Sequence, residues 1–293
     1  MRSFLAAHLG VPVVAAQVQG GGFTPGIAVR LDLGGEWVFV KAIPVGHPLA
    51  AKYRTEAATA VRLPRQVPAP RLRWHGDQAG WVVLIFDDVA GTHPDLSPGS
   101  PDIGITVAAL SAMTEILTPT PAGDLPSTSA TRGRWLRGWA ELSQSLPDDL
   151  GDWERRHLPV LADLESRWLG GADGSTLVHG DIRPDNLLIT SAGTVMVVDW
   201  AQPGNGAAWQ DITDLIPHLI MAGHTPQAAE TTLTGVPAWE AVPPDVITGY
   251  AAAYAGYWTR MARRPDPPGV PHLRAYQRRA SQAALAWTKY RTS

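Results

Sequence analysis

Three oxygen-bearing side chains lie close together in the sequence, at the ends of short apolar runs. Asp181 and Asn186 are five positions apart, and Asp199 follows thirteen positions later, directly after the apolar run 195–198. In phosphoryl transfer, one Asp accepts the proton of the attacking hydroxyl, while an Asn and a second Asp hold magnesium against the nucleotide phosphates. Mg²⁺ prefers oxygen ligands of this kind. The spacing therefore predicts a phosphoryl-transfer site with Asp181 as the base and with Asn186 and Asp199 as metal ligands.

The residues around Asp181 resemble a known catalytic loop. The run 179–186, HGDIRPDN, aligns position by position with the HRDLKPEN loop of protein kinases, and its HxDxxxxN core is similar to that of the aminoglycoside phosphotransferase and choline kinase families. The chain is thus identified as a member of the kinase-like phosphotransferase superfamily. The resemblance implies a catalytic set of Asp181, Arg183 and His179, in which Arg183 neutralises charge on the transferring phosphate and His179 braces the loop. It also implies a bracing role for Asp211.

Each part of this motif also has an ordinary structural interpretation. A lone HGD is common, and an Asp that ends an apolar strand is often only a turn residue. The combination of all three side chains at kinase spacing, with apolar strand-like runs at 187–189 and 195–198, favours the functional interpretation.

Composition excludes several classes of function. The chain has 293 residues, of which 45% are apolar and 17% charged, as is typical of a globular protein. A formal net charge of −3 offers no general attraction to nucleic acid or to an anionic membrane. The absence of Cys excludes disulfides, thiolate catalysis and Cys-ligated zinc. No apolar run approaches the ~18 residues of a transmembrane helix. We therefore expect a cytoplasmic protein without nucleic-acid or membrane partners, and the sequence does not fix its oligomeric state.

The first ninety residues have the pattern of a nucleotide-binding lobe. We expect a short helix at 3–9, a strand at 11–17, a glycine loop at 20–26, and hairpin strands at 27–31 and 37–41. Glycines allow a backbone to approach phosphates closely, although a glycine turn between strands is often just a hairpin. The residues assigned to phosphate contact are Gly21, Gly22, Phe23 and Thr24. The kinase resemblance implies that Lys41 contacts the α- and β-phosphates and that Glu56, on a helix at 49–63, orients Lys41.

Two further strands are expected at 71–75 and 81–86, followed by a polar turn. This turn resembles the hinge between kinase lobes, where backbone groups meet the adenine edge. By that resemblance Phe86 guards the back of the nucleotide pocket, Asp87 offers a main-chain acceptor and Val89 a main-chain donor. A strand running into an ordinary turn would have the same sequence.

The remaining chain has mainly helical periodicity. Helices are predicted at 103–117, 130–146, 153–169, 216–222, 244–263 and 272–291. The expected fold class is α+β, a bilobal protein-kinase-like fold with a small β-rich N-lobe (1–91) that ends in a hinge. A larger, mostly helical C-lobe (92–293) carries the catalytic loop and the substrate-binding region.

The predicted activity is ATP- and Mg²⁺-dependent transfer of the γ-phosphate to a hydroxyl group of a small molecule. The sequence does not choose between ATP and GTP. By analogy with the aminoglycoside and macrolide phosphotransferases, the expected acceptor is an antibiotic or other natural product. A metabolic kinase of choline, homoserine or fructosamine type would share every motif. A nucleotide-binding pseudoenzyme stays open, and a protein kinase is disfavoured because no activation segment follows Asp199.

The C-terminal region bears on the acceptor. A polycationic aminoglycoside needs a cluster of carboxylates, whereas the last helices carry arginines: Arg260, Arg263, Arg264, Arg274, Arg278 and Arg279. If these arginines face the cleft, a neutral or anionic acceptor is expected, with Trp200, Trp209 and Trp258 as stacking surfaces. Alternatively, the arginines face solvent.

Overall fold

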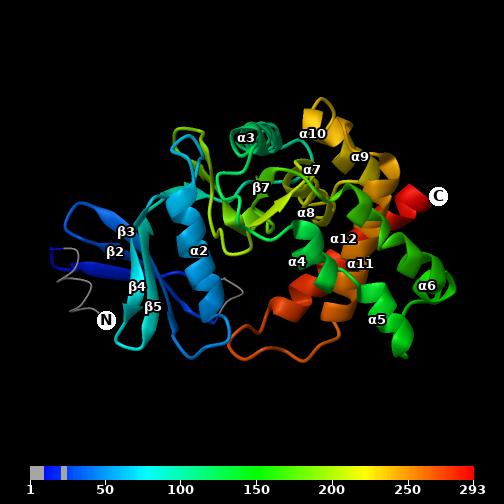
Figure 1. Cartoon of the computed structure of the whole chain (residues 1–293), viewed down its shortest axis with the longest axis horizontal. Helices are drawn as coiled ribbons and strands as arrows, with labels where there is room; N and C mark the ends of the chain where they lie inside the picture. The colour runs from blue at the N-terminus through cyan, green and yellow to red at the C-terminus, as the bar shows by residue number, and fades with distance from the viewer. Residues whose placement is uncertain (1–9, 21–24) are drawn as a thin grey trace. The chain divides into compact units, whose positions relative to one another are not determined.

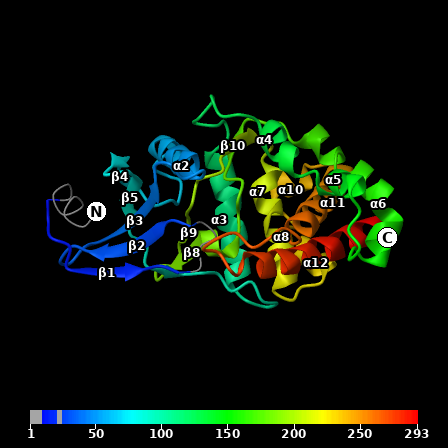
Figure 2. The same ribbon diagram turned by 90° about the horizontal axis from the view of Figure 1, so that it is seen from below.

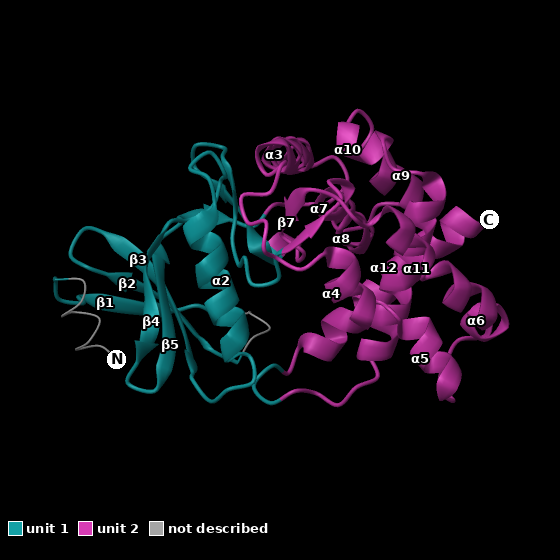
Figure 3. Cartoon of the chain, in the orientation of Figure 1, with its two compact units in different colours: residues 1–93, 185–203, 268–270 teal, residues 94–184, 204–267, 271–293 magenta. Residues whose placement is uncertain are grey.

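The computed structural model of the chain describes residues 10–20 and 25–293. These residues form two compact units (Figure 3). The first unit contains residues 1–93, 185–203 and 268–270, and the second contains 94–184, 204–267 and 271–293. The helix expected at 3–9 and the loop residues Gly21, Gly22, Phe23 and Thr24 lie outside the described residues.

A five-stranded antiparallel sheet dominates the first unit (Figure 1). Its strands are β1 (Ala15–Val18), β2 (Ile27–Asp32), β3 (Trp37–Pro44), β4 (Leu72–Gln78) and β5 (Trp81–Asp87), in the order β1-β2-β3-β5-β4. The expected strand at 11–17 is therefore shorter and begins later, at Ala15. Since β1 is the outermost strand and all four of its residues are exposed, it makes little contribution to the core.

Helix α2 (Ala50–Arg62) covers one face of this sheet. Successive residues of a strand point to opposite faces, so a strand buried on both faces is a continuous apolar run. In β5, Val82, Leu84 and Phe86 pack with the α2 side of the core, while Val83 and Ile85 pack on the other face. The β3–β5 pair is therefore the rigid centre of the unit.

A second, three-stranded sheet completes the first unit. It has the order β6-β8-β9, with β6 (Gly91–Thr92), β8 (Leu187–Thr190) and β9 (Val195–Val197) all antiparallel. Gly91 is required here because a Cβ at this position would lie 2.8 Å from the carbonyl oxygen of Ile189. Residues 187–197 thus form one sheet with residues 91 and 92, which end the N-terminal region.

The second unit is mainly helical. Its helices are α3 (Asp102–Ile116), α4 (Thr128–Trp135), α5 (Gly138–Gln144), α6 (Asp152–Leu164), α7 (Trp209–Thr213), α8 (Leu215–Met221), α9 (Pro226–Thr231), α10 (Pro237–Glu240), α11 (Pro244–Met261) and α12 (Leu273–Thr292). Helices α11 and α12 lie side by side, and α8 packs against α12 (Figure 2). Strands β7 (Thr176–Val178) and β10 (Gly204–Gly206) form a short antiparallel pair. β7 precedes the segment 185–203, which belongs to the first unit, and β10 follows it.

The single helix predicted at 130–146 is wrong, because the chain forms two helices there, α4 and α5. They are separated at Leu136 and Arg137, and Arg137 has non-helical torsions of φ −130° and ψ 36°. The break places Gly138 directly against the backbone of Gly256 in α11, where a Cβ would lie only 2.0 Å from the carbonyl carbon and oxygen. Close packing between these helices therefore overrides the local helical periodicity.

The helix predicted at 153–169 also ends early. α6 stops at Leu164, and a short 3₁₀ helix, η1 (Arg167–Gly171), follows. The C-cap residue Glu165 is buried, and its carboxylate accepts hydrogen bonds from the backbone N–H groups of Trp139 (2.9 Å) and Ala140 (2.7 Å) at the start of α5. Capping another helix thus takes precedence over continuing α6.

The predicted fold class is confirmed in its elements: a β-rich N-terminal region precedes a mostly helical remainder. The predicted helices at 103–117, 216–222, 244–263 and 272–291 are each present, with ends that differ by at most two residues. Among the described helices, none combines the length and apolar character needed to cross a bilayer.

The Gly138–Gly256 contact yields a stability prediction. Gly138→Ala should lower the free energy of unfolding by about 1–3 kcal/mol, because the added methyl group overlaps rigid backbone atoms of Gly256. Urea denaturation would measure the loss. Gly104→Ala, in α3, is the matched control: its Cβ meets nothing within 4 Å. Alanine is a better helix former by roughly 0.5–1 kcal/mol, so this control should be neutral or stabilising. Equal stability of the two variants would contradict the packing argument.

Candidate active site

Lys41 is the centre of a charged cluster in the first unit. Its Nζ lies 2.6 Å from Oε2 of Glu56 and 2.8 Å from Oδ1 of Asp199. Lys41 is held by β3, where it pairs with Leu84 of β5, and Glu56 lies on α2 with only 3% of its surface exposed. The strand, the helix and the segment after β9 therefore meet at one ammonium group.

The surroundings of Lys41 keep it charged. Burial by itself lowers the pKa of this amine, but the carboxylates of Glu56 and Asp199 more than offset that effect and raise the pKa above its usual value. The ring of Tyr53 adds a cation–π contact, with Nζ 5.4 Å from its centroid. The result is a fixed positive charge in a largely dehydrated position.

The β8–β9 hairpin brings Asn186 and Asp199 to the same end of one element. Leu187 pairs with Val197, and the backbone N–H of Val198 donates to the carbonyl of Asn186 at 2.9 Å. Asn186 ends the 3₁₀ turn η2 (Pro184–Asn186) and directly precedes β8. Asp199 is the second residue after β9. The hairpin therefore places Asp199 one residue beyond Val198, the backbone partner of Asn186.

The backbone at Asp199 is unusual. Its φ is +65°, in the left-handed region that residues other than Gly, Asn and Asp seldom adopt. The next residue, Trp200, is buried, and its indole N–H donates to the carbonyl of Val197 at 3.1 Å, which holds the turn in place. A conformation of this kind is often found where a side chain must be aimed at a functional position.

The predicted hinge residues lie at and after the end of β5. Phe86 is buried and belongs to the core that includes Tyr53 of α2. The backbone N–H of Asp87 donates to the carbonyl of Arg71 at 2.8 Å, and its carboxylate accepts from Nε of Arg73 at 2.5 Å. Val89 is half-buried. A role in binding adenine stays a prediction for all three hinge residues.

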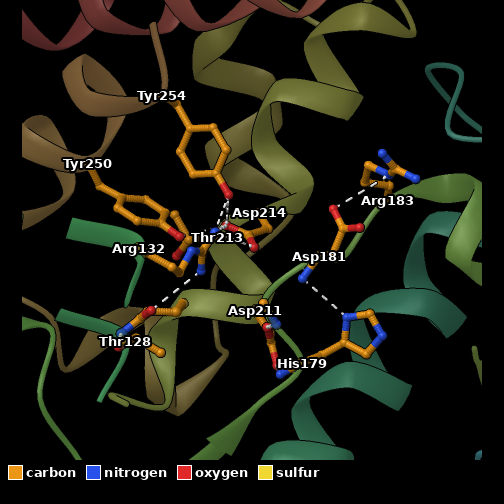
Figure 4. A network of polar contacts seen from close by, with 12 residues as sticks. Thr128, Arg132, His179, Asp181, Arg183, Asp211, Thr213, Asp214, Tyr250 and Tyr254 are labelled. Carbon is orange, nitrogen blue, oxygen red and sulfur yellow. Dashed lines mark hydrogen bonds and ion pairs between the residues drawn. The ribbon is translucent and has the colours of Figure 1, made fainter. Parts of the chain in front are cut away.

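In the second unit, a buried carboxylate supports the loop that is predicted to be catalytic. Asp211 in α7 accepts hydrogen bonds from the backbone N–H groups of His179 (2.7 Å) and Gly180 (3.0 Å), one at each oxygen (Figure 4). His179 is fully buried, and its Nδ1 accepts a hydrogen bond from the backbone N–H of Asp181 at 3.2 Å. The loop that leads from β7 to Asp181 is therefore fixed by side chains on both sides.

Asp181 and Arg183 line a small pocket within the same unit. Nε of Arg183 lies 3.7 Å from Oδ1 of Asp181, and the guanidinium carbon lies 5.8 Å from the ring centroid of Tyr276. Asp214 and His218, from α7 to α8, supply the other polar groups of the pocket, and the rest of its lining is apolar or aromatic. Figure 4 shows Asp181 and Arg183 facing each other at this position.

A buried polar network behind Asp211 was not anticipated from the sequence. Oδ2 of Asp214 lies 3.0 Å from the guanidinium of Arg132 in α4, and Oδ1 accepts from the hydroxyl groups of Tyr250 (2.7 Å) and Tyr254 (2.8 Å). A further hydrogen bond joins Arg132 to Tyr254. The four-residue spacing of the two tyrosines on α11 was the available signal, since it puts two hydroxyl groups on one face of an otherwise apolar helix.

The C-terminal arginines mostly face solvent or pair with carboxylates on the surface. Arg260 pairs with Glu141, and Nε of Arg263 lies 2.9 Å from Asp149. Arg274 is buried and donates to the carbonyl of Pro265, with distances of 2.7 and 3.0 Å. Arg264, Arg278 and Arg279 are exposed, as is Arg263.

The expected stacking surface is wrong for two of the three tryptophans. Trp200 and Trp209 are buried, and each indole N–H donates to a backbone carbonyl. Trp258 alone lines the pocket beside Asp181. Within the described part of the chain, no group of three or more His, Cys, Asp or Glu residues is placed to share a metal ion.

Comparison with known families places this geometry in context. The sequence profile described as the phosphotransferase enzyme family matches residues 20–264. The chain belongs to the phosphotransferase enzyme family. The matched region includes every predicted site residue of this family member, from the glycine loop to Asp199. No curated protein sequence matches the chain.

Solved structures share the fold of this phosphotransferase over nearly its whole length. Choline kinase LicA from Streptococcus pneumoniae has a TM-score of 0.66 at 15% identity, with 97% of each chain covered. Spectinomycin phosphotransferase, solved with ADP and spectinomycin, has a TM-score of 0.64 at 13% identity, with 98% of this chain and 97% of that chain covered. An aminoglycoside phosphotransferase from Alicyclobacillus acidocaldarius has a TM-score of 0.62 at 15% identity, with coverage of 94% and 91%.

These findings confirm the predicted kinase-like fold and the predicted phosphotransferase family. At such low identity the structural likeness concerns the fold alone. The roles of individual site residues and the identity of the acceptor therefore stay predictions.

The Asp211 contacts predict the effect of removing one acceptor. In Asp211→Asn, the amide NH₂ must face either the N–H of His179 or that of Gly180, so one hydrogen bond is lost. We expect the free energy of unfolding to fall by about 1–3 kcal/mol. Hydrogen exchange at these two amides should also become faster.

Asp163→Asn is the control for this variant, because Asp163 is an exposed carboxylate paired only with Arg167 on the surface. Its effect on unfolding should be within about 0.5 kcal/mol. Unchanged exchange at His179 and Gly180 in Asp211→Asn would contradict the bracing role of Asp211.

Proposed function

We propose that the protein transfers the γ-phosphate of a Mg²⁺-bound nucleotide, ATP or GTP, to a hydroxyl group of an antibiotic or other natural product. The observation that carries this proposal is the contact of Lys41 with both Glu56 and Asp199, at 2.6 and 2.8 Å. A lysine held between a helix carboxylate and a metal-binding carboxylate is the arrangement required of an active kinase-like site.

In this proposal the N-lobe, residues 1–91, binds the nucleotide. Lys41 contacts the phosphates and Glu56 orients it. The glycine loop, Gly21 to Thr24, covers the phosphates, while Phe86, Asp87 and Val89 surround the adenine. The fixed charge on Lys41 supports this role, since a preorganised cation stabilises phosphate charge without reorganisation.

Asn186 and Asp199 are the proposed ligands of Mg²⁺. The donor set fits this ion: both offer oxygen, and Mg²⁺ usually takes one or two protein carboxylates and completes its shell with phosphates and water. The ion, held by Asn186 and Asp199, would supply positive charge that offsets the charge of the phosphates. The hairpin register that brings the two residues to one end of β8 and β9 supports a shared ligand.

Asp181 is the proposed base in the C-lobe, residues 92–293. It accepts the proton of the acceptor hydroxyl as the oxygen attacks the γ-phosphorus. Arg183 neutralises charge on the transferring group, and its position beside Asp181 supports this assignment. His179 and Asp211 act as positioning residues, because their contacts run to the loop backbone.

The proposal of an antibiotic acceptor draws on structures with the same fold. One is a spectinomycin phosphotransferase with ADP and spectinomycin, and another is an aminoglycoside phosphotransferase with ADP and hygromycin B. We place the reaction in the cytoplasm, where nucleoside triphosphates are available.

A phosphate-transfer screen tests the proposal. Aminoglycosides, macrolides, nucleoside antibiotics, choline and sugars would each be incubated with Mg²⁺ and ATP or GTP, and the mass of the acceptor followed. A gain of one phosphate on an antibiotic is the expected result. For that acceptor, Asp181→Asn should lower turnover by roughly 10²–10⁴-fold, because the general base is lost, and should leave nucleotide affinity unchanged.

Each of the other outcomes would indicate a different function or a different catalytic base. Phosphate gain on choline alone would indicate a metabolic kinase. Tight nucleotide binding without transfer to any member would favour a pseudoenzyme. Unchanged turnover in Asp181→Asn would show that another group accepts the proton.

The metal assignment predicts a selective effect at Asp199. Asp199→Asn keeps the size of the side chain and tolerates the positive φ, but it removes the charge. We expect the Mg²⁺-dependent gain in nucleotide affinity to fall at least about tenfold, measured by calorimetry with and without Mg²⁺. Asp77→Asn, which changes an exposed carboxylate of the same unit, should keep the full Mg²⁺ effect. If both variants keep it, Asp199 is not a metal ligand.

A further inference from the structure

We propose that Tyr53 is a positioning residue for the phosphates of the nucleotide. Its ring holds the ammonium group of Lys41 and also the chain at Gly26, the last residue of the expected glycine loop. This inference rests on the proposed function and assigns a further residue to its nucleotide site. All of the contacts that carry it lie within the first unit.

Tyr53 approaches Lys41 from the same face of α2 as Glu56. The two residues are three positions apart in this helix, so they lie about one turn apart on one side of it. Nζ of Lys41 is 5.4 Å from the centroid of the Tyr53 ring and 2.6 Å from Oε2 of Glu56. Helix α2 thus supplies the ammonium group with an aromatic partner and an anionic one, which together restrict a flexible side chain.

The phenol contributes a ring and no charge. Tyr53 is 4% exposed, and burial raises the pKa of its hydroxyl. Lys41 opposes this effect and the carboxylates of Glu56 and Asp199 add to it, so the net pKa lies above its ordinary value. The ring can therefore attract the ammonium group through its π face without adding a negative charge that would repel phosphates.

The hydroxyl end of the same ring covers Gly26. A Cβ at Gly26 would overlap the hydroxyl oxygen of Tyr53, and it would lie 3.1 Å from Cζ of that ring and 3.0 Å from the carbonyl oxygen of Ala42. Glycine therefore leaves room for the ring where other residues would not. Gly26 directly precedes β2, and the second residue of β2 pairs with Lys41 of β3. One ring thus contacts both the lysine and the start of the strand beside it.

Packing of the core does not by itself require a tyrosine at this position. Tyr53 belongs to the apolar cluster that includes Leu84 and Phe86 of β5. A leucine could fill part of the same space, but it would lack both the π face beside Lys41 and the hydroxyl end over Gly26. The two roles of Tyr53 can therefore be separated by substitution.

Substitution by leucine separates packing from positioning. We expect Tyr53→Leu to lower the affinity for Mg²⁺·ATP at least about fivefold, because Lys41 loses its aromatic partner. Affinity for adenosine, which has no phosphates, should change by less than about twofold. Calorimetry measures both, and GTP with guanosine replaces this pair if the protein prefers guanine. Tyr290→Leu is the matched control and should bind both ligands as the wild type does, because its ring is 40% exposed in α12.

A second pair of variants tests the contact at Gly26. Gly26→Ala should weaken Mg²⁺·ATP binding at least about fivefold, since the added methyl group must displace the ring. Tyr53→Phe removes the oxygen that this methyl group would overlap and keeps the ring beside Lys41. By itself it should bind Mg²⁺·ATP within about threefold of the wild type. Combined with Gly26→Ala, it should restore binding at least about threefold relative to Gly26→Ala alone.

Several results would overturn the inference. Equal losses of affinity for Mg²⁺·ATP and adenosine in Tyr53→Leu would show that Tyr53 only supports the core. Unchanged Mg²⁺·ATP affinity in Tyr53→Leu, or no restoration in the double variant, would overturn the inference and leave the proposed function intact. Absence of nucleotide binding in the wild type would overturn the proposed function, and this inference with it. If Tyr53→Leu does not fold, the comparison at Gly26 alone decides.

Discussion

A buried ammonium group needs negative partners, and this requirement at Lys41 connects the first unit. An unpaired charge in an apolar interior is so unfavourable that the protein must supply carboxylates or let the amine lose its proton. Here α2 supplies one carboxylate and the segment after β9 supplies the other. The sheet, the helix and the β8–β9 hairpin are therefore tied together electrostatically. In the proposed function, the same three groups serve the nucleotide and its metal.

In the second unit, the main requirement is to fix the conformation of the loop that leads from β7 to Asp181. The catalytic loop has no ladder of its own beyond β7, so its backbone N–H groups are satisfied by the carboxylate of Asp211 and the ring of His179. Asp211 sits on a helix that the Arg132–Asp214 network anchors to α4 and α11. All four residues of that network are buried: Arg132, Asp214, Tyr250 and Tyr254. The geometry of the loop thus depends not on Asp211 alone but also on the helices that support the end of α7.

The parts predicted correctly from the sequence are those with local signals. The continuous apolar run 81–86 marked a strand, which the structure buries on both faces. The spacing of Asp181, Asn186 and Asp199 indicated the family, which is confirmed, while the roles of these residues stay predictions. The helix breaks at Arg137 and Glu165 could not be predicted, because both result from contacts with other helices. The Arg132–Asp214 pair joins residues 82 positions apart, and neither is distinctive by itself. The solvent-facing arginines illustrate the same limit, since composition does not say which way a side chain points.

The left-handed backbone at Asp199 has an evolutionary consequence. Only glycine, asparagine and aspartate adopt this conformation readily, so the fold tolerates three residues there. Of the three, aspartate alone supplies the negative charge of the proposed metal site. Asparagine and glycine codons each lie a single base change from an aspartate codon. A single base change at this codon could therefore remove the charge proposed to bind the metal without straining the backbone. Position 199 is thus a site at which an active phosphotransferase could become an inactive nucleotide-binding protein.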